Sequence, residues 1–242
     1  MKIMKITDAI LNLIFPHTCI GCGANAEASF GYSLCRRCGE EYESLKEEIC
    51  DSCGKAQTKC RCRPTAVASA RVKYIHLIKY DSDLSKKLIF SLKRQNRAVL
   101  RRHLAKELSG ALGNIAGKTD VTYAPRSAAA VREYGFDQSK LLAKAVSKNI
   151  GGRFVELFRH RPGGMAQKEL GLSARAENAA ESYMLNPRAS TDCDTLVIVD
   201  DVITSGNTTS VLCELAAIAG AENVIVLTVA KTGARKYVKN TY

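Results

Sequence analysis

Apolar residues along the chain fall into two alternating patterns, one typical of strands and one typical of helices. Four apolar residues in a row at 196–199, rich in Val and Ile, indicate a strand that is buried on both faces of a parallel sheet. Further strands are predicted at 67–80, 120–124, 154–158 and 224–229. Helical spacing of apolar residues is found between these strands, at 84–108, 141–146 and 211–218. Strands that alternate with helices predict an α/β fold with a doubly wound, mostly parallel sheet.

The residues that follow the strand at 196–199 carry candidate chemistry. Asp200 and Asp201 stand at its carboxyl end, where open α/β sheets bind their ligands. A hydroxyl-rich loop then leads into the next helix, so that backbone amides at the helix N-terminus can cradle a phosphate. The loop consists of Thr204, Ser205, Gly206, Asn207 and Thr208. Carboxylates repel phosphate and suit sugar hydroxyls, or a Mg²⁺ that these hydroxyls hold. The arrangement describes a site for ribose 5-phosphate, and an ordinary strand and turn with exposed acids is the alternative.

This stretch closely resembles the fingerprint of the type I phosphoribosyltransferase fold, which binds 5-phosphoribosyl 1-diphosphate (PRPP). The resemblance implies that Asp200 and Asp201 engage the ribose hydroxyls, that residues 204–208 hold the 5′-phosphate, and that Mg²⁺ accompanies PRPP. Arg126 follows the strand at 120–124 and is a candidate for the diphosphate, although an exposed cation is the alternative. Gln138 is a further candidate in the same group. Glycines and basic residues at 160–165 are typical of a mobile loop.

Eight of the ten cysteines lie between residues 19 and 62 in four closely spaced pairs. The pairs are Cys19 with Cys22, Cys35 with Cys38, Cys50 with Cys53, and Cys60 with Cys62. The first two pairs have the spacing of a four-thiolate zinc site, and the last two have a tighter second half. A disulfide framework is the alternative, but it needs an oxidising compartment, which nothing else in the chain indicates. We therefore expect about two structural Zn²⁺, because four thiolates leave no open position for a substrate.

Length and composition fit a folded protein with one mid-sized domain and one small domain. The chain has 242 residues, of which 46% are hydrophobic and 25% charged. We expect a helix and double zinc ribbon in residues 1–65 and a phosphoribosyltransferase-like domain in residues 66–242. No apolar run approaches the roughly 18 residues of a membrane span. Residues 1–15 form an amphipathic pattern that is unlike a signal peptide, and we expect a docking helix and a cytoplasmic protein.

Positive charge is concentrated in one part of the chain. Residues 71–118 hold 12 lysines and arginines against 3 acids, which accounts for nine of the twelve net positive charges. A solvated helix surface and an anionic partner, above all nucleic acid, both explain this bias. The candidate contacts to DNA are Lys93, Arg94, Arg97, Arg101 and Arg102. Tyr74, Tyr80 and Phe90 lie nearby in the sequence and suit either base stacking or the core.

Several motifs together resemble the competence protein ComF family over nearly the whole chain. They are Ile14-Phe15-Pro16 before the first cysteine pair, the double zinc ribbon, Lys93, Gly135-Phe136-Asp137-Gln138, and Gln167…Leu172…Arg175…Asn178 before the PRPP motif. Tyr134 and Asp137 depart from the Arg and Asn that the family commonly has, which removes a cation and adds an anion. The resemblance implies a cytoplasmic factor in natural transformation that acts on single-stranded DNA, with other competence proteins among its partners.

Two functions of different classes remain open at this point. The first is a binding module, in which a PRPP-binding fold handles single-stranded DNA. The second is a phosphoribosyltransferase that uses PRPP and Mg²⁺ with an unidentified acceptor, whose cation-like transition state needs charge stabilisation and a closing loop. The sequence identifies no catalytic residue and no recognisable acceptor pocket, which favours the binding module.

Overall fold

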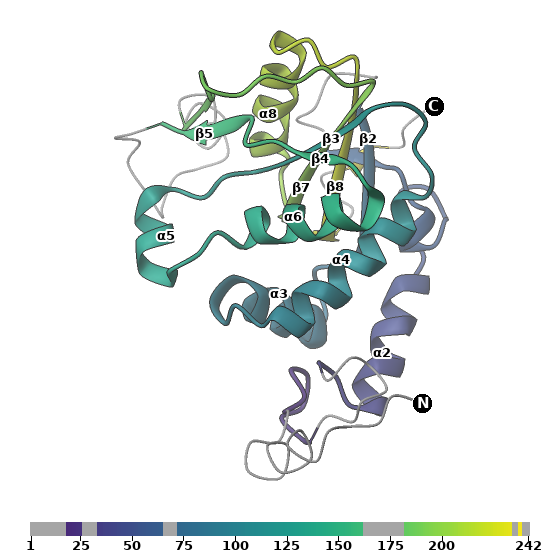
Figure 1. The fold of residues 1–242 in the computed structure, drawn as a ribbon. Coiled ribbons are helices and arrows are strands. Elements are labelled where there is room, and N and C mark those ends of the chain that lie inside the picture. The colour runs from purple at the N-terminus through teal and green to yellow at the C-terminus, as the bar shows by residue number, and fades with distance from the viewer. Residues whose placement is uncertain (1–17, 26–32, 65–71, 162–181, 234–236, 239–242) are drawn as a thin grey trace.

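The centre of the protein is a five-stranded parallel sheet (Figure 1). The computed structural model describes residues 18–25, 33–64, 72–161, 182–233 and 237–238. The strand order is β2-β8-β7-β3-β4 and every neighbouring pair is parallel. The strands are β2 (Val72–Lys79), β3 (Thr119–Tyr123), β4 (Arg153–Phe154), β7 (Thr195–Ile203) and β8 (Asn223–Lys231). The predicted α/β fold class is confirmed.

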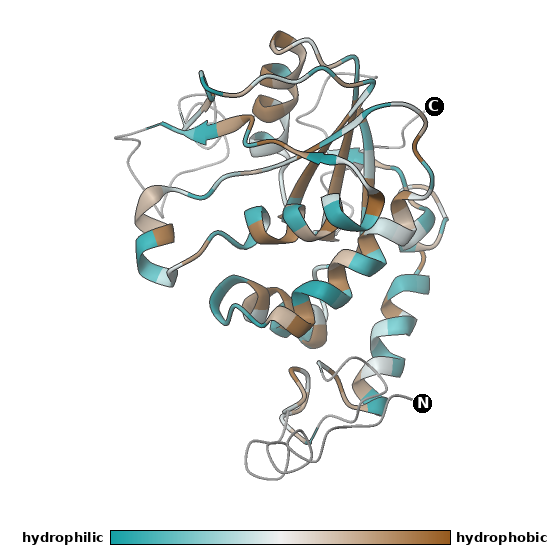
Figure 2. Ribbon diagram, viewed as in Figure 1, coloured by the Kyte–Doolittle hydropathy of each residue, from teal (hydrophilic) through white to brown (hydrophobic). Residues whose placement is uncertain are grey.

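Helices cover both faces of this sheet. On one face pack α3 (Asp83–Arg94), α4 (Ala98–Leu112) and α6 (Gln138–Ile150), and on the other packs α8 (Asn207–Ile218) (Figure 1). Successive residues of β7 point to opposite faces. Val197 and Val199 therefore join the core beneath α3, α4 and α6, whereas Leu196 and Ile198 join the core beneath α8. Figure 2 shows β7 and β8 as hydrophobic along most of their length, as the apolar run at 196–199 predicted.

Two predicted elements are divided in the structure. The single helix expected at 84–108 was wrong, because the chain turns between α3 and α4 at 95–97, where Asn96 has a φ of 28°. Residues 93–97 are all polar, so no apolar side chain holds a continuous helix against the sheet there, and Asn tolerates positive φ better than most residues. The strand expected at 154–158 is likewise split into β4 and β5 (Phe158–His160). β5 leaves the main sheet and pairs antiparallel with β6 (Tyr183–Leu185).

The cysteine-rich segment contacts both cores at the β2 edge of the sheet. It contains α2 (Arg36–Glu47), the 3₁₀ turn η1 (Gln57–Lys59) and β1 (Arg63–Pro64), and β1 pairs antiparallel with β9 (Tyr237–Val238). Cys19 and Cys38 belong to the core beneath α3 and α4. The cysteines at 50, 60 and 62 belong to the core on the other face. A short helix, α5 (Ala128–Tyr134), lies between β3 and α6 in the chain.

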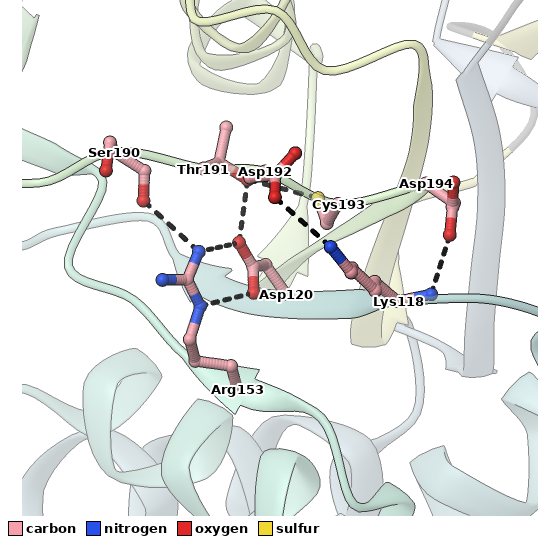
Figure 3. Close-up of polar contacts among 8 residues, drawn as sticks. All are labelled: Lys118, Asp120, Arg153, Ser190, Thr191, Asp192, Cys193 and Asp194. Atoms are coloured by element: carbon pink, nitrogen blue, oxygen red, sulfur yellow. Dashed lines mark hydrogen bonds and ion pairs between the residues drawn. The ribbon is translucent and has the colours of Figure 1, made fainter.

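A polar network ties the amino ends of the strands together (Figure 3). Arg153 donates two hydrogen bonds to the buried carboxylate of Asp120, at 2.8 Å from Nε and 2.6 Å from Nη2, and Thr191 Oγ1 donates a third at 2.7 Å. The backbone amide of Lys118 donates to Asp194 at 2.7 Å. These contacts fix the segment that precedes β7 against β3 and β4. They lie at the opposite end of the sheet from Asp200 and Asp201, and they hold the register of the strand that carries both acids.

Four sequence motifs lie outside the described residues. They are the docking helix at 1–15, the Ile14-Phe15-Pro16 motif, the expected mobile loop beyond residue 161, and the run from Gln167 to Asn178. The expected domain boundary between residues 65 and 66 also falls in such a segment. Within the part of the chain that is described, no helix combines the length and apolar character that a membrane crossing requires.

Candidate functional site

Asp200 and Asp201 lie in the last part of β7, which continues to Ile203 instead of ending at residue 199. Asp201 is buried and accepts a hydrogen bond of 2.5 Å from Gln138 Nε2. Its other oxygen lies 3.3 Å from Lys93 Nζ. Asp200 accepts hydrogen bonds from Ser139 Oγ at 3.0 Å and from the backbone amide of Asp201 at 2.8 Å. The first turn of α6 and the last turn of α3 therefore supply the partners of both acids.

The two carboxylates carry an electrostatic cost. Burial, followed by repulsion from Asp201, raises the pKa of Asp200 to about 7, although Lys93 and the hydrogen bond from Ser139 oppose the shift. Acid pairs with such shifts are typical of sites that bind or react, because a stable fold has no reason of its own to hold them together.

The acids line a cavity of about 380 Å³ at the carboxyl ends of β3 and β7. It brings together eight of the residues singled out in the sequence, namely Tyr80, Lys93, Arg126, Gln138, Asp200, Asp201, Thr204 and Thr208. His160 and Tyr183, from the hairpin β5–β6, also line it. The sequence analysis expected His160 in a mobile loop and did not single out Tyr183, because the two strands of the hairpin are far apart in the sequence.

The loop at 204–208 has the geometry of an anion cradle. Gly206 is the N-cap of α8, with a φ of 86°, a conformation that favours glycine. Because glycine has no side chain to cap the helix, the first amides of α8 are left to face a ligand. A Cβ on Gly206 would also collide with the ring of Pro64. Gly206 is thus required both by its conformation and by the close approach of Pro64.

Two protein-family models match the chain. A phosphoribosyl transferase domain matches residues 95–242, and a double zinc ribbon domain matches residues 10–68. The chain belongs to the phosphoribosyl transferase family. The double zinc ribbon preceding it is consistent with a ComF-like architecture. No curated protein matches the chain significantly.

Several solved structures are similar to this chain at low sequence identity. The allosteric regulatory enzyme of purine biosynthesis is 16% identical, with 58% of this chain and 30% of that chain covered and a TM-score of 0.39. A hypoxanthine phosphoribosyltransferase from Staphylococcus aureus is 13% identical, with 54% and 62% covered and a TM-score of 0.34. The chain thus spans less than two thirds of these two proteins. Adenine phosphoribosyltransferase from Thermoanaerobacter pseudethanolicus is 15% identical, with 79% and 98% covered and a TM-score of 0.39.

The two departures from the ComF pattern have structural partners in this phosphoribosyl transferase domain. Asp137 is the N-cap of α6 and accepts hydrogen bonds from the backbone amides of Lys140 at 3.1 Å and Arg126 at 2.8 Å. The ring of Tyr134 lies 5.2 Å from the Arg94 guanidinium and 4.9 Å from the Arg126 guanidinium. The added anion therefore caps a helix, and the aromatic ring contacts two cations, of which Arg126 lines the cavity.

The five candidate DNA contacts do not share one helix face. Lys93 lines the cavity that contains Asp200 and Asp201, and Arg94 stacks on Phe90 and Tyr134. Beyond the turn, Arg97 donates to the carbonyl of Thr18, Arg101 donates to Asn96 Oδ1 at 2.7 Å, and Arg102 is exposed. Because Lys93 contacts Asp201, it is set apart from the other four cations. The turn after α3 directs the end of this helix toward β7, which the single helix expected at 84–108 did not foresee.

The two cysteine quartets suit two structural zinc ions. Within each quartet the four sulfurs lie within 4.8 Å of one another. Cys22 Sγ and Cys35 Sγ are 3.6 Å apart, which is close to the edge of a zinc–thiolate tetrahedron, about 3.8 Å, and far from a disulfide bond of about 2.0 Å. All ten cysteines are free thiols in the structure, which favours metal binding over the disulfide alternative.

Lys231 contacts the second quartet, which was not predicted from the sequence. It ends β8, is 2% exposed, and its ammonium lies 3.2 Å from Cys50 Sγ and 3.1 Å from Cys60 Sγ. Burial opposes the charge, but amide and ammonium hydrogen bonds lower the pKa of Cys50 to about 6. A lysine at the end of an apolar strand was the available signal, and only the three-dimensional structure shows that it faces the second quartet.

Proposed function

We propose that this protein is a ComF-like competence factor of the cytoplasm that binds PRPP or a related ribose phosphate and handles single-stranded DNA during natural transformation. One observation carries the proposal. The half-buried Asp200 and the buried Asp201, a glycine-capped helix N-terminus and the last lysine of the basic helix α3 border a single cavity.

The proposed binding mode assigns a chemical task to each part of the cavity. The hydroxyls of the ribose replace Gln138 and Lys93 as partners of Asp201, and they approach Asp200 from the open side. Amides and hydroxyls of residues 204–208 receive the 5′-phosphate. Arg126 and the released Lys93 face the diphosphate, and Mg²⁺ neutralises part of its charge. No protein nucleophile is needed for binding.

Single-stranded DNA is proposed to follow the surface next to this cavity. Arg94, which stacks on Phe90 and Tyr134, begins a basic surface that continues through Arg97, Arg101 and Arg102. Phe90 is 52% exposed, which is unusual for a phenylalanine and suits base stacking. The phosphates would be bound by the arginines without regard to base sequence.

One titration series tests the proposal. Anisotropy of a labelled single-stranded oligonucleotide is measured with and without Mg²⁺-PRPP, and calorimetry measures Mg²⁺-PRPP alone. The proposal predicts that both ligands bind. If the protein binds neither ligand near physiological salt, the proposal is contradicted. If it binds only PRPP, the ribose phosphate site is supported and the DNA role is refuted.

A specific observation also favours the second candidate, an active phosphoribosyltransferase. A cavity of about 710 Å³ adjoins the ribose cavity and shares Pro125, Arg126 and His160 with it. Its walls combine Phe136 and Val131 with basic side chains, so it has room and character for an acceptor that the sequence alone did not reveal. The test is release of diphosphate from Mg²⁺-PRPP in the presence of bases, nucleotides or oligonucleotides. Release above the rate without protein, lost on substitution of Asp200 and Asp201, would establish the enzyme.

A further inference from the structure

The second cysteine quartet, Cys50, Cys53, Cys60 and Cys62, is joined to the phosphate loop at 204–208 by two separate connections. The first connection runs through the backbone just after Cys62. Pro64 packs so closely on Gly206 that a Cβ at Gly206 would collide with the Pro64 ring, at 2.7 Å from its Cγ. Pro64 is itself held by pairing of β1 with β9. Gly206, the N-cap of α8, is therefore in close contact with Pro64, which is only two positions from the candidate zinc ligand Cys62.

The second connection runs through the end of β8. Lys231 donates to the sulfurs of Cys50 and Cys60, and it pairs in register with Ile203, the last residue of β7. The next residue, Thr232, donates from its amide to the carbonyl of Ile203 at 3.0 Å and from its hydroxyl to the carbonyl of Thr204 at 3.4 Å. The first residue of the phosphate loop is thus bound to the strand whose end is anchored on the quartet.

Charge makes the contact of Lys231 depend on the state of the second quartet. Zinc with four thiolates has a net negative charge, and an ammonium buried to 2% exposure needs such a partner. A zinc ion held by this quartet would also join Cys50 and Cys53 to Cys60 and Cys62 across the turn η1. Without it, the segment that carries Pro64 would be held by noncovalent contacts alone, among them the pairing of β1 with β9.

The first quartet has a different neighbourhood. Lys87 of α3 donates to the carbonyl of Gly21 at 2.6 Å, and Arg97 donates to the carbonyl of Thr18. These contacts lead to α3 and α4 and not to the loop at 204–208. The chain therefore contains its own control, a second site of the same chemistry with other partners.

We propose that zinc in the second quartet sets the conformation of the phosphate loop, so that affinity for ribose 5-phosphate is linked to zinc occupancy of this quartet. This inference rests on the proposed binding of PRPP or ribose 5-phosphate. Lys231 and Pro64 act as positioning residues, since they reach the ligand only through Thr204 and Gly206. Linkage is reciprocal, so bound PRPP must raise the zinc affinity of the second quartet by the same factor.

The test measures zinc affinity and not activity. The full-length variant Cys22→Ser with Cys35→Ser keeps only the second quartet, and Cys53→Ser with Cys60→Ser keeps only the first. Each is titrated with a chromogenic chelator with and without saturating Mg²⁺-PRPP. We expect PRPP to raise the zinc affinity of the second quartet by about fivefold or more, a typical size for coupling between two sites. The zinc affinity of the first quartet should stay unchanged.

A second measurement covers the case in which a cysteine variant does not fold. Lys231→Met and Pro64→Gly, both with zinc bound, should weaken PRPP binding, whereas Lys87→Met at the first quartet and Pro187→Gly in the turn after β6 should not. If PRPP binds the wild type but its affinity and the zinc affinity are independent in both measurements, the linkage is wrong and the proposed function stands. If PRPP does not bind the wild type, both proposals are overturned.

Discussion

Asp200 and Asp201 are held by side chains that a bound sugar would have to replace. Gln138, Ser139 and Lys93 all contact Asp200 or Asp201. The sequence predicted the acids and Gln138, because they stand at element ends with recognisable spacing. It did not predict that Ser139 contacts Asp200 or that Lys93 contacts Asp201, since both contacts depend on how α3 and α6 pack on β7.

Substitution of Asp200 by asparagine should stabilise the ligand-free protein. The folded-state pKa of Asp200, about 7, lies above its ordinary value of 3.8, so stability falls as pH rises between these values. Asp200→Asn cannot ionise and therefore avoids this loss of stability. Its free energy of unfolding should exceed that of the wild type by a margin that grows by about 1 kcal/mol between pH 6 and pH 8, or about 2–4 °C in melting temperature. Thermal unfolding at both pH values measures it, with the exposed Asp192→Asn as control. If the gain in stability is the same at both pH values, the pKa of Asp200 is not raised as stated.

Lys93 should contribute to PRPP binding and not only to DNA binding. Lys93→Met removes a cation that lies 3.3 Å from Asp201 inside the cavity, and a charge-assisted contact of about 1.5–3 kcal/mol corresponds to a loss of about tenfold or more in affinity. Calorimetry with Mg²⁺-PRPP should show this loss for Lys93→Met and no loss for Arg102→Met, which changes the same charge outside the cavity. If the two substitutions weaken PRPP binding equally, Lys93 acts only through the overall positive charge of the protein and not through a contact in the cavity.

At the scale of elements, long apolar patterns were predicted well and breaks in them were not. β7 and β8 were evident because their residues are apolar on both faces, and α6 because Gly151 ends its periodic pattern with a φ of 69°. The turn between α3 and α4 was missed because an unbroken helix and a helix–turn–helix share the same spacing of leucines. The hairpin β5–β6 was missed because its partners are far apart in the sequence.

Neutral substitutions at the start of α4 should flatten the salt dependence of DNA binding. Each phosphate contact contributes about 0.7 to the slope of log affinity against log salt for single strands, so Arg101→Ala with Arg102→Ala should reduce the slope by about 1.4. The change should be the same for different base sequences. Lys144→Ala with Lys148→Ala on α6 removes the same charge and serves as the matched control. If both double variants change the slope equally, or neither does, the basic surface at α3–α4 is a solvated surface and not a DNA site.

At the scale of the whole molecule, the zinc ribbon and the phosphoribosyl transferase domain share their cores. Cys38 and Tyr42 pack with α3 and α4, and the second quartet packs with residues of the other face. The cysteine spacing predicted both quartets, but their division between the two faces of the sheet follows only from the fold. We retain residues 1–65 and 66–242 as a proposal for the division of the sequence, with the expectation that the two parts stabilise each other.

Removal of zinc should therefore weaken the whole protein. Elemental analysis after purification without chelator should give about two Zn²⁺ per chain, one for each quartet. Cys19→Ser with Cys38→Ser should lower the melting temperature of the sheet domain as well as the zinc content, because both side chains are at most 3% exposed in a core shared with α3. A content of about one Zn²⁺ per chain would show that one of the two quartets does not bind zinc. An unchanged melting temperature at reduced zinc content would show that the ribbon folds apart from the sheet.

The central claim is that the acid pair and the loop at 204–208 form a ribose phosphate site. The most direct measurement is calorimetric titration of Mg²⁺-PRPP into the wild type and into Asp200→Asn with Asp201→Asn. The account predicts saturable binding to the wild type and a loss of at least tenfold, about 1.4 kcal/mol, in a variant that remains folded. No binding to the zinc-loaded wild type, or the same affinity in the variant, would contradict it.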